Sequence, residues 1–127
     1  MSEALSNGIL VEVESEYVPE QSDPQNQAYL FTYHITITNQ SFESIQLISR
    51  HWIITDGDGK VEEVQGPGVV GEQPVLEPGE TFEYSSFCPL KTPMGTMKGS
   101  YQMQAESGES FEAEIAEFSL KPSYTLH

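Results

Sequence analysis

The sequence predicts an all-β protein, an antiparallel β-sandwich of seven or eight strands. Apolar and polar residues alternate with a period of two through most of the chain, and turns rich in Gly, Pro, Asp and Ser separate the alternating segments. No segment carries apolar residues at helical spacing. Because 127 residues suit one domain, we expect a single domain over residues 1–127, with flexible ends at 1–7 and 122–127.

Four strands are expected in the first half of the chain. The first begins near Val11, where apolar residues alternate with glutamates, and the second is the aromatic and β-branched run 29–38, which is typical of a central strand. Residues 45–55 carry apolar side chains on both parities. The Asp-Gly-Asp-Gly segment at 56–59 then forms a tight hairpin turn, because Asp and Gly tolerate positive φ, and the chain returns as the strand 60–65.

Three further strands are expected, at residues 81–87, 97–105 and 110–120. The last of them should break near Ala116, because the apolar residues before and after this position differ in parity. We expect Trp52 or its strand neighbours to lie in the core between the two sheets.

The chain is strongly acidic, with 20 acidic and 5 basic side chains and a net charge of -15. This balance argues against nucleic-acid binding and against anionic membrane surfaces. It favours weak, non-selective binding of divalent cations, which should fade as salt screens the charges. No apolar stretch of the sequence is long enough to cross a membrane, so we expect no membrane insertion. The sequence contains one cysteine, Cys88, so we expect a cytoplasmic protein without disulfide bonds.

Gly66, Gly68 and Gly71 form the spacing G-x-G-x-x-G, which binds a dinucleotide pyrophosphate when a helix begins at the last glycine. Here Pro74 and Pro78 follow too closely for such a helix. The segment is therefore expected to be a shaped loop. Two roles remain for the loop. Its backbone N–H groups could form a concave anion site, although the charge of neighbouring glutamates opposes anion binding. Alternatively, its glycines serve only to allow positive φ or close packing.

The sequence shows no clear metal or catalytic set, and we expect no cofactor. His34 and His51 lie on expected strands without a closely spaced ligand partner, so they are only weak metal candidates. Asp56 and Asp58 begin like a calcium loop, but the residues that follow do not continue the pattern. No histidine lies near Cys88 in sequence, which favours a packed thiol over a nucleophile.

Two loops are candidates for contact with a protein partner. Residues 66–74 and 91–99 are apolar or rich in glycine in an otherwise acidic chain. If the two loops lie side by side, they form an apolar patch with an acidic rim, as many contact sites do. The candidate partner contacts are Val69, Val70, Met94 and Met97.

Four segments resemble the conserved blocks of the ApaG family. Residues 50–59 resemble R-x-W-x-I-x-D-x-x-G and residues 64–74 resemble V-x-G-x-G-V-V-G-x-x-P. Residues 76–84 resemble L-x-P-G-x-x-F-x-Y, and residues 93–101 resemble P-x-G-x-M-x-G-x-Y. The four blocks occur in order over nearly the whole chain, so the sequence is identified as a single ApaG domain.

The resemblance implies an immunoglobulin- or fibronectin-III-like sandwich. It also implies an association with Co²⁺ resistance and Mg²⁺ efflux, and with a gene neighbourhood that includes diadenosine tetraphosphate hydrolase. Related domains recur within larger eukaryotic proteins, including F-box proteins, which favours protein binding. Two hypotheses follow: a non-enzymatic domain acting through protein–protein interaction, or a nucleotide-polyphosphate binder or hydrolase that uses the glycine loop.

Overall fold

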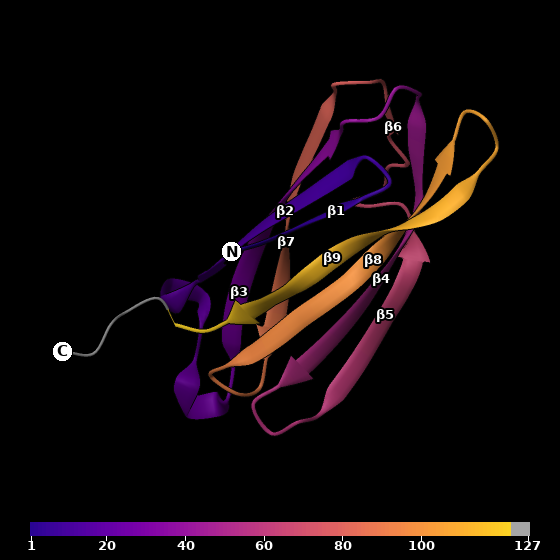
Figure 1. Cartoon of the computed structure of the whole chain (residues 1–127). Coiled ribbons are helices and arrows are strands. Elements are labelled where there is room, and N and C mark those ends of the chain that lie inside the picture. Colours follow the sequence, from indigo (N-terminus) through magenta and orange to yellow (C-terminus); the bar gives the residue numbers. More distant parts are fainter. Residues whose placement is uncertain (123–127) are drawn as a thin grey trace.

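The structure is a computed structural model that describes residues 1–122, and it is a sandwich of two antiparallel sheets (Figure 1). The elements in chain order are β1 (Ser2–Ser6), β2 (Ile9–Tyr17), the short 3-10 helices η1 (Pro19–Gln21) and η2 (Pro24–Asn26), β3 (Tyr29–Asn39), β4 (Ile45–Asp56), β5 (Val61–Pro67), β6 (Val75–Leu76), β7 (Thr81–Leu90), β8 (Gly95–Ala105) and β9 (Ser110–Leu120). The predicted all-β sandwich is confirmed. No helix in residues 1–122 has the length and apolar character needed to cross a membrane.

One sheet has the strand order β1-β2-β3-β7, and the other has the order β5-β4-β8-β9 with β6 paired to β4. The described residues hold nine strands rather than seven or eight, because β1 and the two-residue β6 were not expected. The segment between β2 and β3 contains η1 and η2. Each predicted strand has a counterpart: the last, 110–120, coincides with β9, and the others differ at one or both ends.

The first seven residues differ from the flexible end that the sequence analysis placed there. Ser2–Ser6 pairs with β2 in antiparallel register, and a two-residue turn, Asn7 (φ 47) and Gly8 (φ 84), joins the strands. Asn-Gly is a strong signal for this hairpin turn, because both positions need positive φ. This local signal was sufficient to predict β1. Of the other expected flexible end, 122–127, all but Pro122 lies outside the described residues.

The predicted break in the last strand is confirmed as a β-bulge. Gly99 of β8 pairs with Ile115, but Met97 pairs with Phe118, so two residues of β9 face one residue of β8. The extra residue switches the parity of β9. As a result Ile115 and Phe118 both point into the core.

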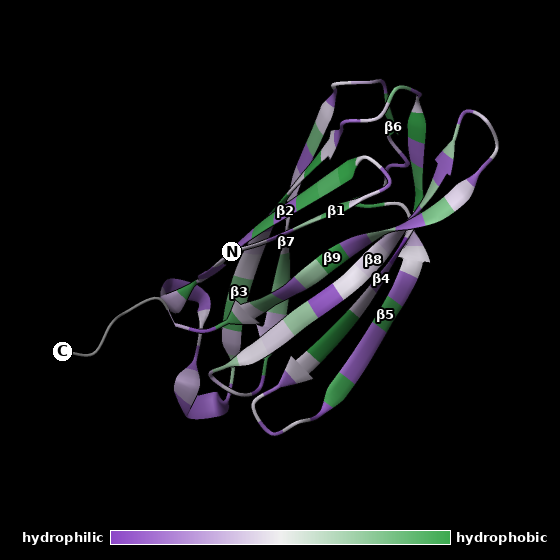
Figure 2. Cartoon of the chain, viewed as in Figure 1, coloured by the Kyte–Doolittle hydropathy of each residue, from purple (hydrophilic) through white to green (hydrophobic). Residues whose placement is uncertain are grey.

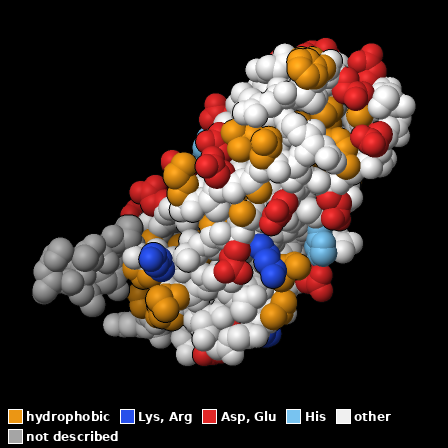
Figure 3. Space-filling model, viewed as in Figure 1, with side chains coloured by type: hydrophobic (Ala, Val, Ile, Leu, Met, Phe, Trp, Pro, Cys, Tyr) orange, Lys and Arg blue, Asp and Glu red, His pale blue; other side chains and the backbone are white. Residues whose placement is uncertain are grey.

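The core lies between the sheets and is built from the inward-facing residues of both. Apolar and polar residues alternate along several of the strands (Figure 2). Trp52 is 3% exposed, which confirms its predicted place in the core. Its ring contacts Tyr33 across the sandwich with a centroid distance of 5.3 Å, and it meets Phe118 edge to face at 6.0 Å. Acidic side chains are spread over the face of the molecule shown in Figure 3.

The two sides of the sandwich differ in how the sheets meet. On one side β1 and β2 contact β9, and hydrogen bonds tie the sheets together: Ser2 Oγ donates to the Ala116 carbonyl at 2.9 Å and Ser15 Oγ to the Ser119 carbonyl at 2.8 Å. On the other side the edge strands are β7 and β5. This second side holds a cavity of about 780 Å³.

Candidate functional site

The glycine motif forms a tight turn rather than the start of a helix. Val69 and Glu72 exchange backbone hydrogen bonds of 2.8 and 2.9 Å, so Val70 and Gly71 form a two-residue turn. Both turn residues have positive φ, 43° and 83°, and Gly68 has φ 61°. The segment continues to β6 without helical residues, so the helix N-terminus of a dinucleotide site is not present here.

The guanidinium group of Arg50 holds the glycine loop through hydrogen bonds. Arg50 Nη1 donates to the carbonyl oxygens of Pro67 and Gly68 at 3.0 and 2.9 Å. A Cβ at position 66 would lie 3.1 Å from the same nitrogen, so Gly66 leaves room for the guanidinium. A Cβ at position 68 would collide with the Glu72 carbonyl oxygen. The loop thus presents carbonyl oxygens to a cation, the opposite polarity to a phosphate cradle.

The four candidate partner contacts fall into two classes. Val69 and Met97 are each 1% exposed, so their assignment as partner contacts is wrong; both pack in the core. Val70 and Met94 are 55% and 56% exposed. Burial of Val69 follows from its place beside the Val70–Gly71 turn, where its side chain faces inward.

The two loops do not form one patch, because they lie at opposite ends of β4. The Gly68 N–H donates to the Ile48 carbonyl at 2.9 Å, near the start of β4. The Gly57 N–H, just beyond the end of β4, donates to Thr92 Oγ1 in the other loop at 2.8 Å. At ~3.3 Å per residue these points are roughly 30 Å apart. The condition for one continuous patch, that the two loops lie side by side, is therefore not met.

The end of the sandwich at which β4 begins, here called the β3–β4 end, carries an apolar side chain on a fixed loop. Phe42 is fully exposed between β3 and β4. The buried Asn39 side chain holds its loop: Nδ2 donates to the carbonyls of Glu43 and Leu76 at 2.9 and 2.8 Å, and Oδ1 accepts from the Ser41 N–H at 2.9 Å. Nothing in the sequence analysis pointed to Asn39 or Phe42.

The histidines lie on different sheets and do not share a site. His34 Nε2 lies 2.8 Å from Glu83 Oε1, and His51 Nε2 lies 2.8 Å from Glu63 Oε1. Each histidine thus has one carboxylate partner. No group of three potential metal ligands converges anywhere in residues 1–122. Asp56 Oδ1 accepts the N–H groups of Asp58 and Lys60 at 2.9 and 3.0 Å, so this carboxylate closes the hairpin turn.

Cys88 is a packed thiol. Its side chain is 3% exposed, and burial, with a smaller contribution from the negative charge of Glu62, raises the pKa of the thiol to about 11. A nucleophilic cysteine needs the opposite shift, because the thiolate is the reactive form. At neutral pH Cys88 is therefore protonated and does not have the environment of a catalytic nucleophile.

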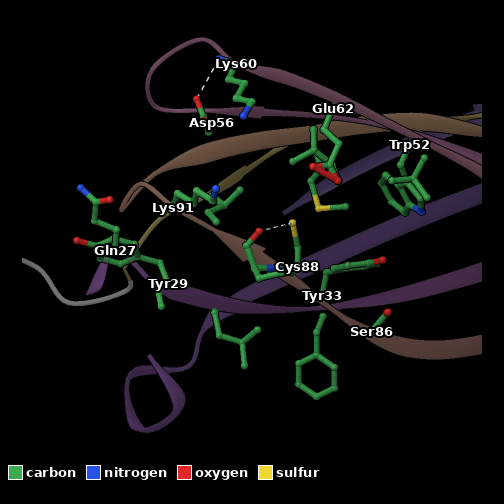
Figure 4. Close-up of a pocket in the computed structure, with 18 of the residues that line it drawn as sticks. Gln27, Tyr29, Tyr33, Trp52, Asp56, Lys60, Glu62, Ser86, Cys88 and Lys91 are labelled. Carbon is green, nitrogen blue, oxygen red and sulfur yellow. Dashed lines mark hydrogen bonds between the residues drawn. The ribbon is translucent and has the colours of Figure 1, made fainter. Parts of the chain in front are cut away.

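A cavity of about 780 Å³ opens at the side where β7 and β5 are the edge strands (Figure 4). Its lining includes the buried Tyr33, Trp52 and Cys88 and the exposed Lys60, Lys91 and Gln27. Sequence reasoning missed this cavity. Its lining comes from five strands, the 3-10 helix η1 and three connecting segments, so no local motif marks it; we call it the open-edge cavity.

The sequence is similar to proteins and domains named ApaG. The family profile described as the ApaG domain matches residues 19–105. A protein named ApaG from Aromatoleum aromaticum is 58% identical over 127 residues and covers 100% of both chains. A protein of the same name from Bordetella pertussis is 58% identical over 119 residues, which are 94% of this chain and 91% of that protein.

Solved structures resemble the fold closely. The crystal structure of a Bordetella pertussis protein described as ApaA has a TM-score of 0.90 at 57% identity, covering 92% of this chain and 95% of that chain. A structural-genomics X-ray structure has a TM-score of 0.89 at 48% identity, covering 98% of this chain and 94% of that chain. The C-terminal domain of wzt, at 9% identity and a TM-score of 0.58, shares the fold alone.

Proposed function

The chain belongs to the ApaG family, and from this premise we propose that it is a non-enzymatic cytoplasmic interaction domain that influences Co²⁺ resistance and Mg²⁺ efflux through a protein partner. The cation association comes from the family resemblance. Action through a partner is favoured because no three potential ligands converge in residues 1–122. Direct binding of Co²⁺ or Mg²⁺ should be weak and non-selective, since it depends on the net charge of -15.

The observation that carries this proposal is the pair of exposed apolar side chains at the β3–β4 end. Phe42 is fully exposed and Val70 is 55% exposed, and hydrogen bonds fix the loops of both. Both loops lie toward the first half of β4: Phe42 is three residues before Ile45, the first residue of β4, and the Gly68 N–H donates to the carbonyl of Ile48, three residues after it. Rigid loops lose little entropy on binding, so exposed aromatic and aliphatic groups there suit a protein contact.

Backbone strain at Val70 supports the same assignment. A β-branched residue rarely adopts a positive φ, yet Val70 has φ 43° and presents its side chain to solvent. Asn or Gly would fit this turn position with less strain. Strained residues of this kind cluster at functional sites, where the contribution of the side chain to function offsets the free-energy cost of the strained backbone.

No observation at the glycine loop favours the nucleotide-polyphosphate alternative. The Arg50 guanidinium is engaged by two loop carbonyls, and the Gly68, Val69 and Glu72 N–H groups already donate to backbone oxygens. We therefore propose only the interaction function.

The experiment compares three baits in native lysate: the wild-type chain, the double variant Phe42→Ser with Val70→Ser, and the control Met94→Ser. Met94 matches Val70 in exposure, 56% against 55%, but lies at the other end of β4. Trp52 fluorescence and thermal unfolding verify that each bait is folded. We expect the double variant alone to lose the partner that mass spectrometry identifies with the wild-type bait.

A second measurement links the surface to cation handling. Cells that lack the gene are complemented with each variant and grown in Co²⁺, and their Mg²⁺ content is measured. We expect Met94→Ser to restore Co²⁺ resistance and the double variant to fail. Full rescue by the double variant, or a stoichiometric and salt-resistant Co²⁺ site in calorimetry, would contradict the proposal.

A further inference from the structure

We propose that the open-edge cavity binds a small organic acid that has an apolar body and one anionic group. The cavity lies between β7 on one sheet and β4 and β5 on the other, at the side of the sandwich where hydrogen bonds do not close the sheets. Its volume of about 780 Å³ is within the range of ~300–1,000 Å³ found for small-molecule sites. Nothing in the family resemblance assigns a ligand to this cavity.

The interior of the cavity is apolar. Core residues Tyr33, Trp52 and Met97 form its deep wall, and Ile54 and Val64, which are only half-buried, line the part nearer to solvent. Apolar groups left partly exposed on a concave surface gain free energy when a ligand covers them. The interior therefore selects a ligand with an aromatic or aliphatic body.

The charge of the lining selects an anion. Three of the five basic residues of the chain, Arg50, Lys60 and Lys91, line this cavity together with two carboxylates, Asp56 and Glu62. By contrast, acidic residues outnumber basic ones four to one in the chain as a whole, 20 against 5. The lining thus carries one net positive charge on a strongly acidic protein, with Glu62 as the carboxylate that a bound anion would have to avoid.

The two lysines are the available partners for an anion. Arg50 Nη1 is already engaged by two carbonyls, and Asp56 Oδ1 by two backbone N–H groups. Within residues 1–122 the only carboxylate pairs of basic side chains are those of His34 and His51, so neither lysine has an ion-pair partner there. Lys60 and Lys91 are both exposed residues of the lining (Figure 4), so they would meet the carboxylate of a ligand whose body is inside the cavity.

The single tryptophan makes the cavity directly observable, because the protein has one indole N–H signal in an NMR spectrum. The probes are 3-phenylpropionate and octanoate, with 3-phenylpropanamide and octanamide as uncharged matches and acetate as the match without an apolar body. We expect saturable shifts of the Trp52 indole with both carboxylates. Their amides and acetate should bind at least ~10-fold more weakly, since each lacks one of the two recognised features.

The protein variants test the charge directly. Lys60→Gln combined with Lys91→Gln should weaken carboxylate binding ~10-fold and remove the preference for carboxylate over amide. Lys98→Gln, a lysine outside this cavity, should leave binding unchanged. Binding to the wild type should weaken as salt is raised from 0.1 M to 1 M, because the screening length falls from ~10 Å to ~3 Å.

Three results would overturn the proposal: no saturation by either carboxylate, equal affinity for carboxylate and amide, or unchanged carboxylate affinity in the double lysine variant. A further arm uses ATP. If ATP binds more strongly than both carboxylates and its binding depends on the two lysines, the proposed organic acid is wrong and the ligand is a nucleotide. Phe42 and Val70 do not line the cavity. A failure of partner capture and a failure of acid binding are therefore independent results, one against the proposed function and the other against the proposed ligand.

Discussion

Alanine substitutions at the three motif glycines should differ sharply in their cost to stability. Gly68 has φ 61°, and a Cβ there would collide with the Glu72 carbonyl oxygen. Gly71 has φ 83°, but a Cβ there would meet no atom within 4 Å. A Cβ at position 66 would approach only the end of the Arg50 side chain, at 3.1 Å. The series therefore separates backbone strain from steric collision.

The magnitudes follow from these contacts. Positive φ costs an L-residue ~1–2 kcal/mol, which is the whole penalty expected for Gly71→Ala. Gly68→Ala adds a collision that must open the Val69–Glu72 turn, and the two hydrogen bonds of that turn contribute about 1 kcal/mol each. We expect a loss of ~3 kcal/mol for Gly68→Ala, ~1 kcal/mol for Gly71→Ala and below ~0.5 kcal/mol for Gly66→Ala, because a guanidinium can shift slightly.

Urea unfolding monitored by Trp52 fluorescence gives the free energy of unfolding for each variant. The slope against urea should not change, so the midpoint reports stability alone. ATP at saturating concentration is added in parallel and should raise the stability of no variant, whereas a bound ligand at 100 times its Kd would add ~2.7 kcal/mol. Equal losses at positions 68 and 71, or ATP stabilisation that Gly68→Ala abolishes in a folded protein, would refute the structural role of the loop.

Three further predictions concern strain, the Asn39 network and pH. Val70→Asn should stabilise the protein by ~1 kcal/mol in urea unfolding, because Asn tolerates the positive φ of this turn; an unchanged midpoint would show that the strain is not real. Asn39→Ala should destabilise by ~2–4 kcal/mol, because it leaves the buried carbonyl of Leu76 without its donor and opens the loop of Phe42, which amide exchange at Ser41 would report. Burial raises the pKa of Cys88 to about 11 and raises the pKa values of Tyr33, Tyr84 and Tyr101, so the unfolded chain ionises first. These four groups therefore leave stability unchanged at neutral pH and lower it as pH rises above about 9. Cys88→Ala should reduce the fall by at most ~2.7 kcal/mol, because the pKa of the thiol rises from 9.0 to about 11.

Local patterns were sufficient for the strands and for several turns. Alternation with a period of two reports which side chains share a face, and this is a property of the strand itself. The parity change around Ala116 therefore predicted the β-bulge of β9, and the Asp-Gly-Asp-Gly segment predicted the β4–β5 turn. Asn7-Gly8 carried an equally local signal for the β1–β2 turn, which the sequence analysis did not use.

The candidate site depended on contacts that no local pattern contains. Val69 and Met97 have the same apolar character as the exposed Val70 and Met94, and only the packing of each loop against the sheets decides which side chain is buried. The loops 66–74 and 91–99 lie at opposite ends because each bonds to a different part of β4. The first bonds to Ile48 near the start of β4, and the second bonds to Gly57 just beyond its end.

What the sequence alone determined is the class of fold, the strand positions, the acidic character and, through its four conserved blocks, the family. What only the tertiary structure decided is where side chains distant in sequence meet. Asn39 reaches Leu76 and Arg50 reaches Gly68 because β3, β4 and the loops after β5 come together at one end of the sandwich. Lys60 and Lys91 line one cavity because β5 and β7 are the edge strands on the same side. Strand formation depends on neighbours in the chain, whereas a site depends on strand pairing between distant segments, which residue spacing does not encode.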